Sequence, residues 1–345
     1  MSPWGNKPAL GLLGNPDNRR IRDFQDTAER LGWPRPPCLA YRDLLRDPGL
    51  LAAWQVEAVR IDSPGENEDV ARGLIALGGG PAQADLEHGQ IGYLREYHRG
   101  FCRVLEWVAT SGLRCWNEPG EIAAMFDKEA CHRRFVAAGL PRPRVGRDLL
   151  ERAAGRVFLK PLHGSSASGV CALRWRPGRR ELIAPLRIVQ GRLFNSLKVS
   201  RTTDPGEIER ILGELEPQGM ICEEWIPKLT LAGGAVDLRV LVIAGEARHR
   251  VVRQSRHPMT NLHLGNRRGE ESALLAAIGP ERLEAALRLA EQAAACFPGS
   301  LAAGVDILLD TSHRAVVGEI NAFGDLLPGL RHRGETAYEA LCRAF

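Results

Sequence analysis

The change in strand pattern along the chain constrains its fold most strongly. Near the amino terminus, a short apolar run at residues 9–16 (ALGLLGNP) precedes an amphipathic, helix-like segment at residues 18–32. Further on, strand-like runs follow one another directly, and residues 237–245 (DLRVLVIAG) turn straight into residues 246–255 (EARHRVVRQS). The first pattern predicts parallel strands joined by helices, and the second predicts antiparallel sheet.

A chain of 345 residues is too long for one small core, so we expect two or three lobes with a cleft between them. Residues 38–41 and 58–61 read as further strands of the first lobe, and residues 91–110 read as a helix. The Asn117-Glu118-Pro119 run then breaks the helical pattern. The predicted domains are residues 1–115, 116–195 and 196–345.

Composition and charge narrow the class of protein. A formal net charge of +4 over this length is too small for a dedicated nucleic-acid binder. No stretch approaches the roughly 20 apolar residues that cross a bilayer, and the amino terminus lacks the pattern of a signal peptide. The 8 cysteines stand singly, without metal-ligand spacing. We therefore expect a cytoplasmic protein with reduced thiols and no nucleic-acid or membrane partner, although a catalytic cysteine stays open.

Residues 160–170 (KPLHGSSASGV) join two apolar runs through a loop of small residues. Such a loop leaves backbone N–H groups free to approach phosphate oxygens, and Lys160 adds a positive charge at its start. The loop lacks the Gly-Lys-Ser/Thr ending of a P-loop. Taken alone, such a loop is more often an ordinary hairpin turn.

Three oxygen-bearing side chains near the carboxyl terminus suit a divalent cation. Asp306 lies on one predicted strand, and Glu319 and Asn321 are spaced to share one face of the next strand. Mg²⁺ prefers carboxylate and amide oxygens. The alternative is that these are solvated groups beside a turn. However, the sequence neighbours of Glu319 in VVGEINAF are mostly apolar, so an unpaired charge there would be costly.

Two arginines lie on the two arms of the predicted hairpin. Side-chain alternation places Arg239 and Arg253 so that both can face the same side of the sheet. Forked guanidinium groups suit phosphate or a developing acyl phosphate.

The order of these pieces resembles the ATP-grasp superfamily over roughly residues 116–330. The matching segments are Phe126-Asp127-Lys128, VFLKPLHGSSASGV, ICEEWI, VDLRVLVIAGE, VVRQS followed by Asn261, AGVDILLD and GEINAF. The pattern is most similar to the branch containing ribosomal-protein S6 glutamate ligases and glutathione synthetase. The resemblance implies a mixed α+β and α/β protein: an ATP-grasp fold of two α+β subdomains gripping ATP, preceded by a small Rossmann-like pre-ATP-grasp lobe.

The resemblance also implies roles for individual residues. Those expected to bind ATP are Lys128, Lys160, Gly164, Ser165, Ser166, Gly169, Glu223, Glu224, Trp225 and Ile226. Those expected around the γ-phosphate and the acceptor are Arg239, Arg253 and Asn261. The expected metal ligands are Asp306, Glu319 and Asn321. They would bind two Mg²⁺ ions, for which Mn²⁺ could substitute.

Two features depart from the usual pattern. Ala167 stands where relatives often carry glycine in the phosphate loop, and the first lobe contains GNPDNRR and RIDSPGE, which resemble a little-characterised bacterial ATP-grasp family. Polar residues at the strand ends of this lobe suit either substrate recognition or simple capping and turns. They are Asn15, Arg19, Arg20, Arg60, Asp62 and Ser63.

The expected activity is carboxylate–amine ligation through an acyl phosphate, with release of ADP and phosphate. The carboxylate and the amine can belong to small molecules or to peptides, and a homodimer stays open. Two alternatives remain: an ATP-grasp kinase that phosphorylates a hydroxyl, and a module that senses nucleotide or binds peptide without turnover.

Overall fold

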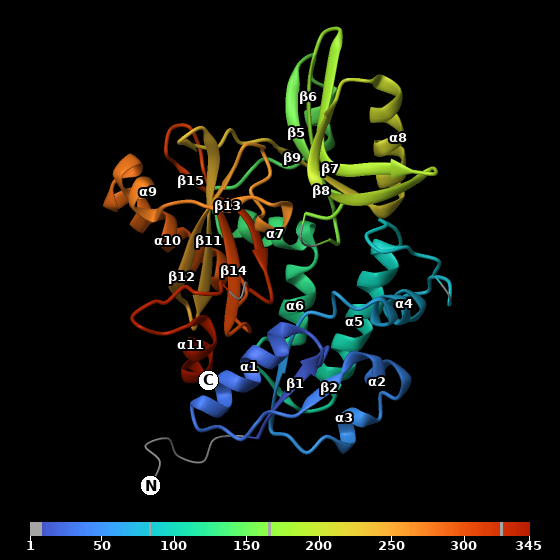
Figure 1. Cartoon of the computed structure of the whole chain (residues 1–345), viewed down its shortest axis with the longest axis vertical. Coiled ribbons are helices and arrows are strands. Elements are labelled where there is room, and N and C mark those ends of the chain that lie inside the picture. Colours follow the sequence, from blue (N-terminus) through green and yellow to red (C-terminus); the bar gives the residue numbers. More distant parts are fainter. Residues whose placement is uncertain (1–8, 83, 165–166, 325–326) are drawn as a thin grey trace.

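The computed structural model describes residues 9–82, 84–164, 167–324 and 327–345. Within these residues the chain forms three lobes, each on its own sheet, with helices α6 (Pro119–Met125) and α7 (Lys128–Ala137) between them (Figure 1). No helix in these ranges is long and apolar enough to cross a membrane.

The first lobe is a parallel sheet in the order β2-β1-β3-β4, covered by helices. Its strands are β1 (Leu10–Gly14), β2 (Cys38–Ala40), β3 (Ala58–Ile61) and β4 (Arg114–Cys115). Its helices are α1 (Arg19–Arg30), α2 (Tyr41–Arg46), α3 (Leu50–Ala53), α4 (Glu68–Leu77) and α5 (Leu94–Thr110). Every position of β1 is buried, as expected for a strand covered on both faces. The strand predicted over residues 38–41 is one residue shorter, because Tyr41 begins α2.

The central lobe is an antiparallel sheet in the order β8-β7-β6-β5-β9. Its strands are β5 (Gly155–Pro161), β6 (Cys171–Arg176), β7 (Arg179–Val189), β8 (Arg192–Thr202) and β9 (Met220–Glu224). Helix α8 (Pro205–Leu215) packs on this sheet through Ile208, Ile211 and Leu215, and short 3₁₀ turns lie at Arg147–Glu151 and Glu216–Gln218.

The carboxyl-terminal lobe is a second antiparallel sheet, ordered β13-β12-β11-β14-β15, with β10 beside β11. Its strands are β10 (Thr230–Leu231), β11 (Gly234–Ile243), β12 (Glu246–Ser255), β13 (Arg267–Arg268), β14 (Ala302–Leu309) and β15 (Ala315–Asn321). Its helices are α9 (Glu271–Ile278), α10 (Pro280–Ala295) and α11 (Ala337–Ala344), with a 3₁₀ turn at Leu262–Leu264. The hairpin read from residues 237–255 is therefore the β11–β12 pair.

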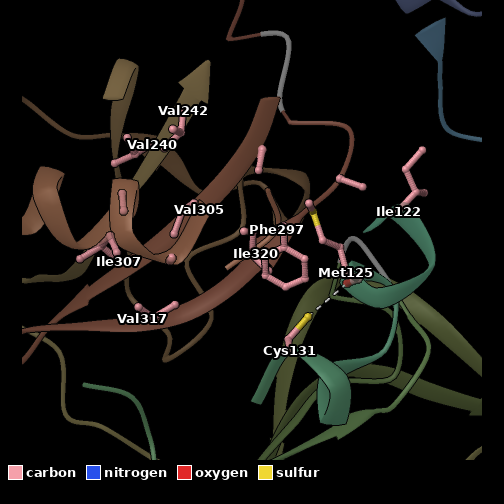
Figure 2. Packing of buried hydrophobic residues seen from close by; sticks show 14 of the residues in the cluster. Ile122, Met125, Cys131, Val240, Val242, Phe297, Val305, Ile307, Val317 and Ile320 are labelled. Carbon is pink, nitrogen blue, oxygen red and sulfur yellow. Dashed lines mark hydrogen bonds between the residues drawn. The ribbon is translucent and has the colours of Figure 1, made fainter. Parts of the chain in front are cut away.

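One face of this sheet builds the main core. Val240 on β11, Val305 on β14 and Ile320 on β15 are buried together with Met125 of α6 and Cys131 of α7, as Figure 2 shows. Because side chains alternate along a strand, the residues between these apolar positions face the opposite side. That opposite face carries Asp237, Arg253 and Asp306, which line a cleft together with residues of the central lobe.

Candidate active site

Three charged residues lie side by side across the carboxyl-terminal sheet. Arg239 on β11 pairs in register with Asp306 on β14, which pairs in turn with Glu319 on β15. Arg239 Nε lies 2.8 Å from Asp306 Oδ1. The arginine and the two carboxylates expected from the motifs are thus neighbours on one sheet face.

A β-bulge at Gly318 orients Glu319. Asp306 pairs with Glu319, but the next residue, Ile307, pairs with Val317. In a regular strand residues 317 and 319 would face the same side, and the extra residue separates them. Val317 consequently joins the core while Glu319 lines the cleft between the lobes.

Asp237 is the centre of a buried charge network on the same face. Arg253 donates to it with two nitrogens, Nε to Oδ1 at 2.8 Å and Nη2 to Oδ2 at 2.9 Å. Lys228 Nζ donates to Asp237 Oδ2 at 2.9 Å, and the Thr260 hydroxyl donates to the same oxygen. Arg253 Nη2 also lies 3.0 Å from Asp306 Oδ2, so Arg239 and Arg253 do share one sheet face, as the alternation predicts.

Two lysines reach the cleft from different elements. Asp127 caps α7 by accepting from the backbone of the first turn, which places Lys128 at its first position. Lys128 Nζ donates to the carbonyl of Gly164 at 2.7 Å and lies 3.6 Å from Glu319 Oε1. Lys160 on β5 lies 2.5 Å from Glu223 Oε2 on the neighbouring strand β9.

The loop between β5 and β6 is only partly described. Ser165 and Ser166, expected to bind phosphate, lie outside the described residues. Ala167 has φ +62 and Gly169 has φ +69, both in the left-handed region that glycine adopts most easily. Glycine at position 167 would therefore adopt this backbone conformation with less strain than Ala167 does.

The end of β9 and the segment after it border the cleft. Glu223, Glu224 and Ile226 line it, as expected from the motif. Trp225 does not appear among the lining residues, and its ring packs on Phe158 with centroids 5.5 Å apart.

The described residues outline two adjoining spaces. The first, which we call the interlobe cleft, lies between the central and carboxyl-terminal sheets and has a volume of about 80 Å³. The second, which we call the first-lobe cavity, has a volume of about 450 Å³ and is walled partly by the start of α1 and the loop before α4. Gly164, Asn261 and Glu319 line both, so the two spaces meet there.

The expected metal ligands are divided between these spaces. Asp306 lines the interlobe cleft, Asn321 lines the first-lobe cavity, and Glu319 lines both. Burial would raise the pKa of Glu319, but the positive charges of Lys128 and Lys160 outweigh it and lower that pKa, whereas burial raises the pKa of Asp306. The oxygens suit a hard divalent cation that takes further ligands from a bound molecule or water. In the ranges described, no group of three His, Cys, Asp or Glu residues could hold a metal ion unaided.

Three residues of the site were not assigned a role from the sequence: Lys228, Asp237 and Thr260. Burial lowers the pKa of Lys228, and the positive charges around Asp237 hold the pKa of that carboxyl well below its usual range despite burial. Lys228 and Asp237 are buried charges paired with each other, a pattern that often marks a functional site. Lys228, Asp237 and Thr260 are brought into contact only in the folded structure.

Comparison with solved structures identifies the fold. The chain is similar to the D-cycloserine synthetase DcsG, with a TM-score of 0.60, 14% identity and coverage of 97% of each chain. It is similar to the macrocyclase MdnC bound with precursor peptide MdnA from Microcystis aeruginosa MRC (TM-score 0.54, 15% identity, 97% of this chain and 98% of that one). It is also similar to the ATP-grasp ligase PsnB complexed with minimal precursor, Mg and ADP (0.53, 15%, 97% and 96%).

No protein-family model matches the sequence, and no curated protein matches it. At identities this low, the structural likeness establishes the architecture. The chain has the ATP-grasp fold, which confirms the fold class expected from the sequence.

Proposed function

We propose that this protein is an ATP- and Mg²⁺-dependent ligase that joins a carboxylate to an amine through an acyl phosphate. One observation carries the proposal: Lys128, Lys160 and the carboxylates of Asp306 and Glu319 come from three separate segments and line one interlobe cleft. Two structural neighbours support it, one described as an ATP-grasp ligase complexed with Mg and ADP and the other as a D-cycloserine synthetase. Membership of the branch with S6 glutamate ligases and glutathione synthetase stays a prediction from the motifs.

ATP would bind in the interlobe cleft, with Glu223, Glu224 and Ile226 at the adenine and ribose end. Lys128 and Lys160 would contact the phosphates, exchanging their present partners Glu319 and Glu223 for phosphate oxygens. A cleft of about 80 Å³ is much smaller than the roughly 300 Å³ or more of typical ligand sites. ATP entry therefore requires the central lobe to move away from the carboxyl-terminal lobe.

Asp306, Glu319 and Asn321 would hold Mg²⁺ together with phosphate oxygens. The fit rests on their oxygen donors and on the nearness of the two carboxylates, which are register partners on adjacent strands. The bound ions would supply charge neutralisation of the phosphates. Arg239 and Arg253 now form ion pairs with Asp306, and the guanidinium group of Arg239 would turn to substrate oxygens when a cation takes that carboxylate.

The reaction would run at the junction of the two spaces. A substrate carboxylate in the first-lobe cavity attacks the γ-phosphorus of ATP, the bond to the β-phosphate oxygen breaks, and ADP leaves. Arg239, which lines that cavity, and Asn261, which lines both spaces, would orient the carboxylate. An amine then attacks the acyl carbon and phosphate departs, while a guanidinium group stabilises the negative charge on oxygen.

Glu319→Gln tests this proposal. The substitution keeps the shape but removes the charge, so ADP release stimulated by desalted cell extract with pooled carboxylates and amines should fall more than about a hundredfold. Glu284→Gln is the matched control, because Glu284 is exposed on α10 beside Arg288. Release of one free phosphate per ADP supports ligation, whereas phosphate retained on the product indicates a kinase. Near wild-type activity in Glu319→Gln would contradict the assigned role of this carboxylate.

A further inference from the structure

The first-lobe cavity has chemically different ends. Its volume of about 450 Å³ lies within the range of small-molecule sites. Arg239 and Asn321 line it on the side of the carboxyl-terminal sheet, and Glu66 lines it on the side of the first lobe. A ligand that spans it meets both sets of groups.

The sheet end offers hydrogen-bond donors. The Arg239 side chain is 11% exposed and is a fixed cation beside Asp306. Asn321 Nδ2 is buried and has no hydrogen-bond partner among the residues that the structure describes. A buried amide donor without a partner is costly, and a ligand oxygen would satisfy it. This end suits a carboxylate.

The first-lobe end carries a carboxylate whose charge is not balanced locally. Glu66 Oε2 accepts a hydrogen bond from Asn18 Nδ2 at 3.0 Å, and within the described ranges no cation pairs with it. The arginines nearby have acidic partners of their own, since Arg19 pairs with Asp23 and Arg20 with Asp62. Glu66 is thus the group at this end best able to accept an ammonium ion.

The backbone around Glu66 is held in an unusual conformation. Glu66 has φ +63, a region that glutamate rarely adopts. Asn15 Nδ2 donates to the carbonyls of Pro64 and Gly65, and Asn67 caps α4 by accepting from the backbone of Val70. These bonds fix the loop on both sides of Glu66, and strained residues held this way are often functional.

Part of the cavity wall is apolar. Phe126, Phe323 and Met125 line the cavity, and the two aromatic rings have their centroids 5.5 Å apart. This surface suits the carbon body of a ligand whose polar groups lie at its ends.

We propose that the first-lobe cavity binds an ω-amino acid as the substrate that is activated, with its carboxylate at Arg239 and Asn321, its carbon chain along the apolar wall and its ammonium group at Glu66. The proposal rests on the ligase function above and narrows the acid to a zwitterion. The carboxylate then faces the junction where Glu319 and Asn261 line both spaces, while the ammonium group is held away from the reacting carbon.

A trapping assay tests the assignment. Hydroxylamine converts an acyl phosphate to a hydroxamate and releases phosphate, so the assay needs no knowledge of the natural amine. The probes are the ω-amino acids β-alanine, γ-aminobutyrate, δ-aminovalerate and ε-aminocaproate, the proteinogenic α-amino acids for comparison, and the N-acetyl derivatives of all of them, each with Mg²⁺-ATP. We expect hydroxamate from one or a few of the ω-amino acids, and none from their N-acetyl derivatives or from α-amino acids that lack a second amino group.

Glu66→Gln supplies the residue-level test. The KM for the amino acid should rise about tenfold or more, the value of one charged hydrogen bond, while kcat and ATP affinity stay near wild type. Glu68→Gln is the control, because Glu68 lies two residues further along, is exposed and pairs with Arg72. An unchanged KM in Glu66→Gln, or N-acetyl derivatives that react as well as free amino acids, overturns the proposal.

The two proposals fail in different ways. ADP release with cell extract, but no hydroxamate from any free amino acid, overturns the amino-acid site and leaves the ligase function standing. Absence of ATP turnover with every probe and with extract contradicts the ligase function and the amino-acid site together.

Discussion

Arg239 and Asp306 face each other across β11 and β14, with Nε and Oδ1 2.8 Å apart, so a proposed catalytic cation and a proposed metal ligand neutralise each other. Arg253 reaches the same carboxylate from β12, with Nη2 3.0 Å from Oδ2. Two arginines therefore share Asp306, and a cation that takes this carboxylate frees Arg239, whereas Arg253 keeps its fork on Asp237. The arrangement links metal binding to the availability of guanidinium groups for substrate.

The two arginines should respond differently to substitution by lysine. Arg239 lines the first-lobe cavity, whereas Arg253 lines the interlobe cleft and is forked on Asp237. Arg239→Lys keeps the charge but loses the fork, so we expect stimulated ADP release to fall at least about tenfold with ATP affinity unchanged. Arg253→Lys should instead lower thermal stability and weaken ATP binding. Binding of a fluorescent ATP analogue and a melting curve check both, and the same defect in the two variants would contradict the division.

Gly304 leaves the space that Arg239 occupies. A Cβ at this position would lie 2.9 Å from Arg239 Nη1 and 3.0 Å from the Cα of Gly324, closer than such contacts normally come. Gly304→Ala should therefore displace the arginine or the chain after β15, and stimulated ADP release should fall by about tenfold or more.

Gly213→Ala is the control for that experiment. Gly213 is exposed within α8, and nothing lies within 4 Å of a Cβ added there. Because glycine weakens a helix interior, this change should stabilise the protein by roughly 0.5–1 kcal/mol without loss of activity. Equal activity in the two variants would show that the space at Gly304 is not needed.

The sequence was most informative where chemistry and strand period coincide. Glu319 and Asn321 stand two apart in an apolar run, which predicted their common face, and both line the first-lobe cavity. Arg239 and Arg253 were placed on one face by alternation, and their shared contact with Asp306 confirms it. Strand alternation is local, so it can be read from neighbouring residues alone.

Features that depend on distant segments could not be read in this way. The bulge at Gly318 appears only when β15 is paired with β14. Asp237 reads as one polar residue in a strand until Lys228 and Arg253 are brought to it by the fold. Glu66 becomes a candidate ligand only because the first lobe stands against the carboxyl-terminal lobe, where the two together enclose a cavity.

Asp237 should be among the most sensitive buried charges of the site. Its neutralisation in Asp237→Asn leaves Arg253 and Lys228 buried without their shared counter-charge, so we expect a loss of about 3–5 kcal/mol in the free energy of unfolding. Asp148→Asn is the control, since Asp148 is half exposed and pairs with Arg144 near the surface. That change should cost under about 1 kcal/mol. Denaturant unfolding compares the two, and similar losses would contradict the proposed role of burial.

Asp62 gives a prediction on pH. Burial would raise the pKa of this carboxyl, but the guanidinium groups of Arg20 and Arg60 outweigh burial and hold it at about 2, below the ordinary 3.8. Because each pKa unit is worth roughly 1.4 kcal/mol, the ionised form stabilises the fold by about 2 kcal/mol. A lowered pKa means that this contribution is fully present above about pH 4 and is lost as the pH falls toward 2.

Asp62→Asn isolates that contribution, because asparagine resembles the protonated acid. The variant should be less stable than wild type by about 2 kcal/mol at pH 6, since Arg20 and Arg60 lose their counter-charge. The difference should shrink below pH 4, where Asp62 of the unfolded wild type takes up a proton that the native state binds only near pH 2. Urea unfolding midpoints of both proteins from pH 6 to pH 2.5 measure it. A difference that stays constant over this range would mean that the asparagine acts through packing or hydrogen bonding. The charge of Asp62, which holds Arg20 while that arginine also donates to the carbonyl of Phe323, would then not be the cause.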